Sequence, residues 1–170
     1  MKQHHYNVIP ECYADTVLVE MLGFTRPNHA VNSNISYVLK TVRASLPNQK
    51  VVGIIDSDRG KSEKLLEGFN LIDEQQDIKK FSCDKQTILV ICPAFEGWIF
   101  GNAAKQNIDP ADHHFKTPKY FRRKCKHINA KRNQDLKQFL NTLKQKQAPG
   151  FTQLKTWICE GAGIDENDLT

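Results

Sequence analysis

Five acidic side chains follow three short apolar segments of this 170-residue chain, a spacing that could gather carboxylates around a metal ion. They are Glu11, Asp15, Asp56, Asp58 and Glu96. If the apolar segments are neighbouring parallel strands, their carboxyl ends bring these groups to one edge of a sheet. Two unit charges ~4 Å apart repel by about 4 kcal/mol at an effective dielectric near 20, and a divalent cation removes that repulsion. Carboxylates without His or Cys suit Mg²⁺ or Mn²⁺, so the sequence predicts a site for one of these ions.

Such a site would be suited to phosphodiester hydrolysis. Bound metal ions polarise a phosphodiester, lower the pKa of a bound water and stabilise the leaving oxygen. Arg59 and Lys61 follow the Asp-Ser-Asp turn and could neutralise a phosphate beside the metal, although a plain solvent-exposed role fits them equally well. Taken singly, an Asp-x-Asp pair is also ordinary turn chemistry, and an acid early in a helix also serves the helix dipole. The repetition at three segment ends is what favours a metal site.

The elements that would position these acids follow from the pattern of apolar residues. Continuous β-prone runs predict strands at 6–9, 51–55, 78–82 and 88–92. Apolar residues at helical spacing predict helices at 14–22, 32–46 and 95–105, and a short helix fits 62–69. This order predicts an α/β fold with an open, largely parallel sheet and helices on both faces.

The composition of the chain changes at about residue 108. Residues 1–108 would form the α/β core, and residues 109–170 a basic, mostly helical extension packed on that core. Prolines interrupt the start of the extension, and helical spacing resumes at about 131–146. A break at Pro149-Gly150 would then precede a last helix at 153–160.

Positive charge is concentrated in this extension. The segment 116–146 holds eleven Lys and Arg against Asp135 alone, a net charge of +10, so the remaining residues carry −5 of the total of +5. Such asymmetry favours a polyanionic partner, and we expect nucleic acid, although a solvated surface has the same composition. Tyr120 and Phe121 lie within the run and would either stack on bases or anchor the core. The candidate nucleic-acid-binding residues are Arg59, Lys116, Lys119, Arg122, Arg123, Lys124, Lys126, Lys131 and Arg132.

Composition argues against several other classes of protein. Hydrophobic residues make up 39% of the chain and charged residues 25%, which is ordinary for a globular protein, and every apolar run is too short to span a bilayer. The first residues have no apolar signal core, so we expect a cytoplasmic protein without a membrane partner. Five cysteines without a Cys-x-x-Cys pair predict free thiols, mostly in the core. The sequence makes no prediction of oligomeric state.

The acidic motifs resemble the Toprim domain, which topoisomerases, bacterial primases, overcoming-lysogenization-defect nucleases and small defence-associated nucleases share. The stretch from Val8 to Asp15 is similar to the family's Glu-Gly-x-x-Asp/Glu motif, and the stretch from Gly53 to Gly60 is similar to its Asp-x-Asp motif. The stretch from Cys92 to Asn102 resembles the Glu- and Trp-containing motif of small Toprim-like proteins from mobile and defence loci. The resemblance covers about residues 6–105.

This resemblance implies a metal-dependent nuclease that acts on DNA or RNA, in a phage-defence or mobile-element system. Glu11 would be a metal ligand or general acid/base, Asp56 and Asp58 would hold Mg²⁺ or Mn²⁺, and Asp15 and Glu96 would complete the site. Family members of this size often accompany an ATPase, so the resemblance also implies an ATPase partner. The expected catalytic residues are Glu11, Asp56, Asp58 and Lys61.

Two departures from the family pattern favour a second hypothesis. Cys12 stands where the family has glycine, and Asn102 stands where an aspartate is common. A Toprim-like chain with these changes would be a non-catalytic nucleic-acid-binding or regulatory subunit. A minor alternative is a haloacid-dehalogenase-like phosphatase with Asp56 as its nucleophile.

Two further stretches of the sequence partly match known functional motifs. Gly60-Lys61-Ser62 looks like the end of a P-loop, but Ile55 stands where the first glycine of that motif is required. Arg122 and His127 have the Arg-x4-His spacing of certain helical ribonucleases, and their position in a basic run makes an ordinary cationic surface the better interpretation.

Overall fold

In the computed structural model, which describes residues 4–30, 34–45 and 48–169, one open mixed sheet has the strand order β1-β2-β5-β4-β3. β1 (Val8–Pro10), β2 (Val51–Asp56) and β5 (Gln86–Ile91) are parallel neighbours. β3 (Asn70–Gln75) and β4 (Ile78–Cys83) form an antiparallel hairpin beside β5. The α/β class is therefore confirmed, and the sheet is evenly mixed where a largely parallel one was expected.

The hairpin explains this difference in strand direction. Gln75 pairs with Ile78, and the two residues between them, Gln76 and Asp77, both have positive φ (51° and 58°). Two central residues with positive φ are what a type I′ turn requires, and its twist matches that of paired antiparallel strands. The sequence did not predict strand β3, because every residue in it is exposed and it has no alternation of apolar and polar residues.

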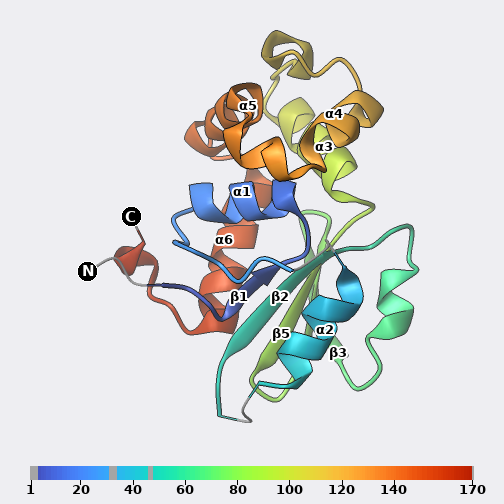
Figure 1. Cartoon of the computed structure of the whole chain (residues 1–170), viewed down its shortest axis with the longest axis vertical. Helices are drawn as coiled ribbons and strands as arrows, with labels where there is room; N and C mark the ends of the chain where they lie inside the picture. Colours follow the sequence, from blue (N-terminus) through green and yellow to red (C-terminus); the bar gives the residue numbers. More distant parts are fainter. Residues whose placement is uncertain (1–3, 31–33, 46–47, 170) are drawn as a thin grey trace.

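Helices cover both faces of the sheet, as the sequence predicted (Figure 1). α2 (Ile35–Arg43) packs its Val38 and Val42 on one face. α1 (Tyr13–Met21), α3 (Phe95–Lys105) and α6 (Pro149–Ala162) share a second core with the opposite face. Residues 32, 33 and 46 of the predicted second helix, with Pro47 after it, lie outside the described residues.

The prolines of the extension start helices instead of interrupting them. α4 (Pro118–Cys125) was not expected; Thr117 caps it by accepting a hydrogen bond from the Tyr120 N–H (3.1 Å), and Pro118 takes the first helical position. Pro149 likewise begins α6 instead of breaking the chain. Proline suits this position because its missing N–H would have no partner in the first turn. α5 (Gln134–Gln145) confirms the predicted helix, whereas 62–69 forms only a 3₁₀ segment at Ser62–Leu65.

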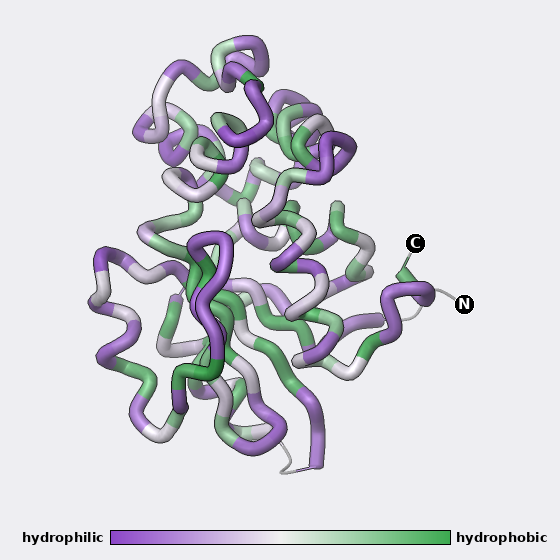
Figure 2. Tube along the Cα trace, turned by 180° about the vertical axis from the view of Figure 1, so that it is seen from behind, coloured by the Kyte–Doolittle hydropathy of each residue, from purple (hydrophilic) through white to green (hydrophobic). Residues whose placement is uncertain are grey.

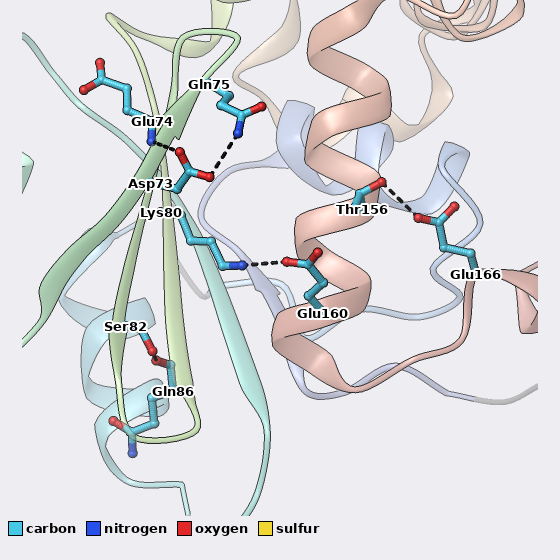
Figure 3. Close-up of polar contacts among 9 residues, drawn as sticks. All are labelled: Asp73, Glu74, Gln75, Lys80, Ser82, Gln86, Thr156, Glu160 and Glu166. Carbon is cyan, nitrogen blue, oxygen red and sulfur yellow. Dashed lines mark hydrogen bonds and ion pairs between the residues drawn. The ribbon is translucent and has the colours of Figure 1, made fainter.

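The helices of the extension gather at one end of the molecule, and α6 returns along the sheet (Figure 1). α6 contacts β2, β4 and β5 as well as α3 and α5. Lys80 of β4 joins the sheet to this helix by an ion pair with Glu160 (2.6 Å; Figure 3). Its Nζ also lies 5.5 Å from the centre of the Trp157 ring. In Figure 2 the central strands are hydrophobic, whereas much of the helical end is hydrophilic. The extension thus contacts α1 through α5 and the 3₁₀ segment Ile128–Arg132, and it contacts the sheet through its last helix.

Gly53 allows α2 to lie close to β2. A Cβ at this position would lie 2.7 Å from Val38 Cγ1 and 2.8 Å from Ile88 Cδ1. Gly53→Ala should therefore destabilise the protein by about 1–3 kcal/mol and lower its Tm by roughly 3–10 °C in a thermal unfolding experiment. Gly101→Ala is the matched control, because a Cβ there meets no atom within 4 Å and alanine favours a helix interior. Equal Tm values for the two variants would contradict this packing.

The remaining sequence predictions about the core can be checked residue by residue. The five cysteines are free thiols, and Cys12, Cys125 and Cys159 are buried, as expected. Phe121 is buried in the core and Tyr120 packs against it, which favours their role as anchors of the extension. Within the described part of the chain, no helix is both long and apolar enough to cross a membrane.

Candidate functional site

The three parallel strands bring their carboxyl ends to one edge of the sheet. Glu11 follows β1 directly, and its backbone N–H donates to the Ile54 carbonyl of β2 (3.0 Å). Its side chain reaches the end of β2, where Oε2 accepts a hydrogen bond from the Asp56 N–H (3.1 Å). Asp56 is the last residue of β2 and pairs with Ile91 of β5. The first two acidic segments are therefore joined by direct hydrogen bonds.

The Asp56 carboxylate also joins β2 to α3. Its Oδ1 accepts a hydrogen bond from the Phe95 N–H (3.0 Å), at the first turn of that helix. The residue at the N-cap, Ala94, provides no side-chain acceptor, so Asp56 fills that role from the neighbouring strand. A carboxylate at this position is also favoured by the helix dipole. Glu96 follows in the same turn, with its side chain only 16% exposed.

Asp15 and Cys12 form the start of α1. The Cys12 N–H donates to Asp15 Oδ2 (3.2 Å), and the Asp15 N–H donates to Cys12 Sγ (3.4 Å), which makes a reciprocal capping box. Cys12, at the position where the Toprim motif that this stretch resembles has glycine, thus has a local role as a helix cap. Asp15 is 2% exposed, and its second oxygen, Oδ1, is buried without a hydrogen-bond partner. A buried carboxylate oxygen without a donor is an acceptor left for a cation or an ordered water.

Burial raises the pKa of Glu11, Asp15 and Asp56. Burial, followed by the nearby charge of Asp15, raises the pKa of Glu11 to about 7. Burial raises the pKa of Asp15 to about 6, although the hydrogen bonds with Cys12 lower it. Burial and the charges of Asp15 and Glu11 raise the pKa of Asp56 well above its ordinary value. Holding these groups together as carboxylates therefore has a free-energy cost that a bound cation would relieve.

The extension supplies positive charge to this acidic edge. Arg122 of α4 forms an ion pair with Glu96, with 3.7 Å between Nε and Oε1. Lys126 lies just after α4, one turn beyond Arg122. Its positive charge lowers the pKa of Glu11, Asp15 and Asp56, which opposes the effect of burial. Sequence reasoning assigned both residues to nucleic acid alone. Their proximity to the acids had no signal in the sequence, because α4 itself was not expected.

Asp58, the second aspartate of the Asp-Ser-Asp turn, faces solvent. Asp58 has a side chain 65% exposed and lies 3.9 Å from Lys61 Nζ. Of the charges that raise the pKa of Glu11, that of Asp58 is the weakest. Arg59 and Lys61 are exposed beside it. The structure thus gathers Glu11, Asp15, Asp56 and Glu96 at the partly buried edge of the sheet and leaves Asp58 at the rim.

Ser57, between the two aspartates, belongs to a separate polar group. Its Oγ accepts from the Gly60 N–H (2.9 Å) and donates to Glu63 Oε1 (3.2 Å). Glu63 in turn pairs with Lys79 of β4 (3.2 Å). Sequence reasoning did not single out Glu63 or Lys79, and these contacts hold the turn after β2 against the hairpin.

Asn102, at the position where the family often has an aspartate, stabilises the junction of α3 and α6. It is 1% exposed, its Oδ1 accepts from the Gly150 N–H (2.8 Å), and its Nδ2 donates to the Trp98 carbonyl (3.0 Å). A Cβ at Gly150 would lie 2.5 Å from this amide, so the junction is tightly packed. The asparagine is therefore explained by a structural contact, and it does not by itself count against a functional site.

The remaining basic residues named from the sequence are all exposed. Lys131 is engaged in an ion pair with Glu20 of α1 (3.0 Å). Lys116 and Lys119 form no ion pair with any described residue. A separate pocket of about 580 Å³ is lined by Arg123, Lys124, His127, Asn129, Arg132 and Asn133. Arg122 does not line it, so the Arg-x4-His pair of the sequence does not converge there.

Within residues 4–30, 34–45 and 48–169, no three His, Cys, Asp or Glu side chains stand close enough together to hold an ion without adjustment. The donor set still fits a hard cation, because it consists of carboxylates and includes the unpartnered Asp15 oxygen. Comparisons of the chain with protein-family models, with curated proteins and with solved structures found no match.

Proposed function

We propose that this protein is a Toprim-like nuclease that hydrolyses phosphodiester bonds of DNA or RNA with Mg²⁺ or Mn²⁺. The observation that carries the proposal is the convergence of half-buried acids at the carboxyl ends of β1 and β2 and the start of α3. The pKa values of Glu11, Asp15 and Asp56 are raised first by burial, and Arg122 and Lys126 lie on the same edge. The resemblance to Toprim motifs and the basic extension support the same activity.

Each residue then has a distinct role. Asp15, Asp56 and Glu96 would hold the ion, and Asp58 would join them by turning inward from the rim. When bound, the metal would activate a water and stabilise charge on the phosphate. Glu11, whose pKa of about 7 is near the working pH, would accept the proton of the attacking water as the P–O ester bond breaks. Arg122, Lys126 and Lys61 would bind phosphate oxygens.

A cleavage assay tests this proposal. Labelled single- and double-stranded DNA and RNA are incubated with the purified protein in Mg²⁺, in Mn²⁺ and in EDTA. We expect cleavage in either metal, no cleavage in EDTA, and none with Asp56→Ala/Asp58→Ala, because the ligands that bind the ion are removed. Cleavage that persists in the double variant would overturn the assignment of the site.

The alternatives predict different results in the same experiment. A non-catalytic subunit would bind the nucleic acids without cutting them in either metal, and addition of an ATPase partner, which we also propose, would then be required for any activity. A haloacid-dehalogenase-like phosphatase would hydrolyse a small phosphate monoester while leaving the polynucleotides intact.

A further inference from the structure

The pocket on the extension has the composition of a phosphate site. Three cationic side chains, one His and two amides line its volume of about 580 Å³, and no carboxylate is among its lining residues. Arginine matches phosphate oxygens with two parallel N–H donors, and amides add neutral donors. The cations line the pocket without any counter-charge, so an anion would relieve their mutual repulsion.

The pocket is supported by buried neighbours. α4 ends in the core with Phe121 and Cys125, and the following 3₁₀ segment, Ile128–Arg132, buries Ala130. Asn133 caps α5 by accepting a hydrogen bond from the Leu136 N–H with its Oδ1 (3.1 Å). Its Nδ2 is therefore the part of the amide left to donate to a ligand. The lining side chains thus extend from backbone that is fixed by packing on both sides.

The cations that line this pocket form no ion pair with a described residue, whereas the cations beside it do. Arg122 is paired with Glu96 and Lys131 with Glu20. Arg123 and Lys124 instead lie 5.4 and 5.7 Å from the ring of Tyr120, a contact that orients both cations without neutralising them. Arg132 makes no ion pair within the described part of the chain.

We propose that this pocket binds a phosphate monoester, either the terminal phosphate of a polynucleotide or the phosphate of a free nucleotide. A monoester is close to a dianion at neutral pH, since its second pKa is near 6, and it presents three acceptor oxygens. A pocket with three cations and no acid suits that charge better than the single charge of an internal diester. Arg123 adjoins Arg122 on α4, so a strand whose end occupied the pocket would lie next to the carboxylate edge. The placement of the strand next to the carboxylate edge is the only part of this inference that rests on the proposed nuclease function.

A binding experiment in EDTA tests the pocket independently of any cleavage. Fluorescence anisotropy would compare one labelled single strand with a 5′-phosphate, with a 3′-phosphate and with hydroxyl groups at both ends. We expect one phosphorylated end to bind at least about 10-fold more tightly than the hydroxyl form, as two charge-assisted hydrogen bonds would give. Arg123→Gln/Arg132→Gln should abolish this preference.

Lys116→Gln/Lys119→Gln is the matched control, because it removes the same charge from exposed positions outside the pocket. It should weaken binding to all three strands alike and keep the preference. Competition with inorganic phosphate and a nucleoside monophosphate distinguishes the sources. In one outcome, the nucleotide competes with the labelled strand on the wild type but not on the pocket variant, while no phosphorylated strand is preferred. That result supports the free nucleotide as the ligand. The inference is overturned if neither a phosphorylated end nor a nucleotide binds better to the wild type than to the pocket variant.

Discussion

Asp56→Asn should reduce metal-dependent cleavage by roughly 10²- to 10⁴-fold, whereas Asp58→Asn should reduce it by about 10-fold or less. The two residues occupy equivalent places in the Asp-x-Asp motif but different environments. Asp56 is held between the Glu11 side chain and the Phe95 N–H at the buried edge of the sheet. Asp58 is exposed and lies beside Lys61, so its carboxylate can be replaced by water at lower cost. Initial rates of cleavage at saturating Mg²⁺ would measure the difference.

Glu74→Gln is the control for this comparison. It also removes one carboxylate, but from an exposed position on β3, at the sheet edge opposite β1. Its cleavage rate should equal that of the wild type. Circular dichroism would establish that each variant is folded before its rate is interpreted. If Asp58→Asn were as damaging as Asp56→Asn, the division between buried and rim ligands would be wrong.

Glu11→Gln should stabilise the metal-free protein at pH 8 while it abolishes cleavage. Burial and the charge of Asp15 raise the pKa of Glu11 from 4.5 to about 7. Ionised Glu11 therefore opposes folding at pH values above 7, and this cost disappears as pH falls toward 4.5, where the unfolded chain also becomes protonated. A rise of that size corresponds to about 3 kcal/mol, or roughly 6–12 °C in Tm for a chain of this length. The Gln oxygen can still accept the Asp56 N–H, so the variant keeps the hydrogen bond.

Thermal unfolding in EDTA at pH 4.5 and pH 8 would measure this effect. The Tm gain of Glu11→Gln should be large at pH 8 and small at pH 4.5, while Glu74→Gln should match the wild type at both. Saturating Mg²⁺ at pH 8 should raise the Tm of the wild type more than that of the variant, because the ion relieves a repulsion that the variant has already lost. A lower Tm for Glu11→Gln at pH 8 would mean that the Glu11 charge stabilises the fold, and would remove the physical basis of the metal site.

The sequence alone determined the α/β class and the position of the acids at the ends of strands. β2 and β5 are continuous apolar runs because they are buried on both faces, and such runs are visible without coordinates. A residue that follows a buried strand must lie at its carboxyl end. Glu11, Asp56 and Glu96 could thus be placed on one edge before the strand order was known.

Sequence patterns did not predict the elements whose stability depends on contacts with other elements. β3 carries no apolar pattern because its residues are all exposed, and its place depends on pairing with β4. α4 has few apolar residues and begins at a proline, so its sequence does not predict a helix, although packing buries Phe121 and Cys125 in the core. β3 is stabilised by pairing with the adjoining strand β4, whereas α4 is stabilised by core residues that are distant in the sequence.

The tertiary structure also decided which charges act together. Sequence spacing made Asp56 and Asp58 equivalent and made Arg122 and Arg123 equivalent, since hydropathy does not distinguish members of a pair. Packing buries Asp56 and exposes Asp58, and it turns Arg122 toward Glu96 while Arg123 lines a separate pocket. The type of each charged residue is fixed by the sequence, but its partner and its exposure depend on how α4 and the sheet pack, because electrostatic energy depends on distance and on the surrounding dielectric.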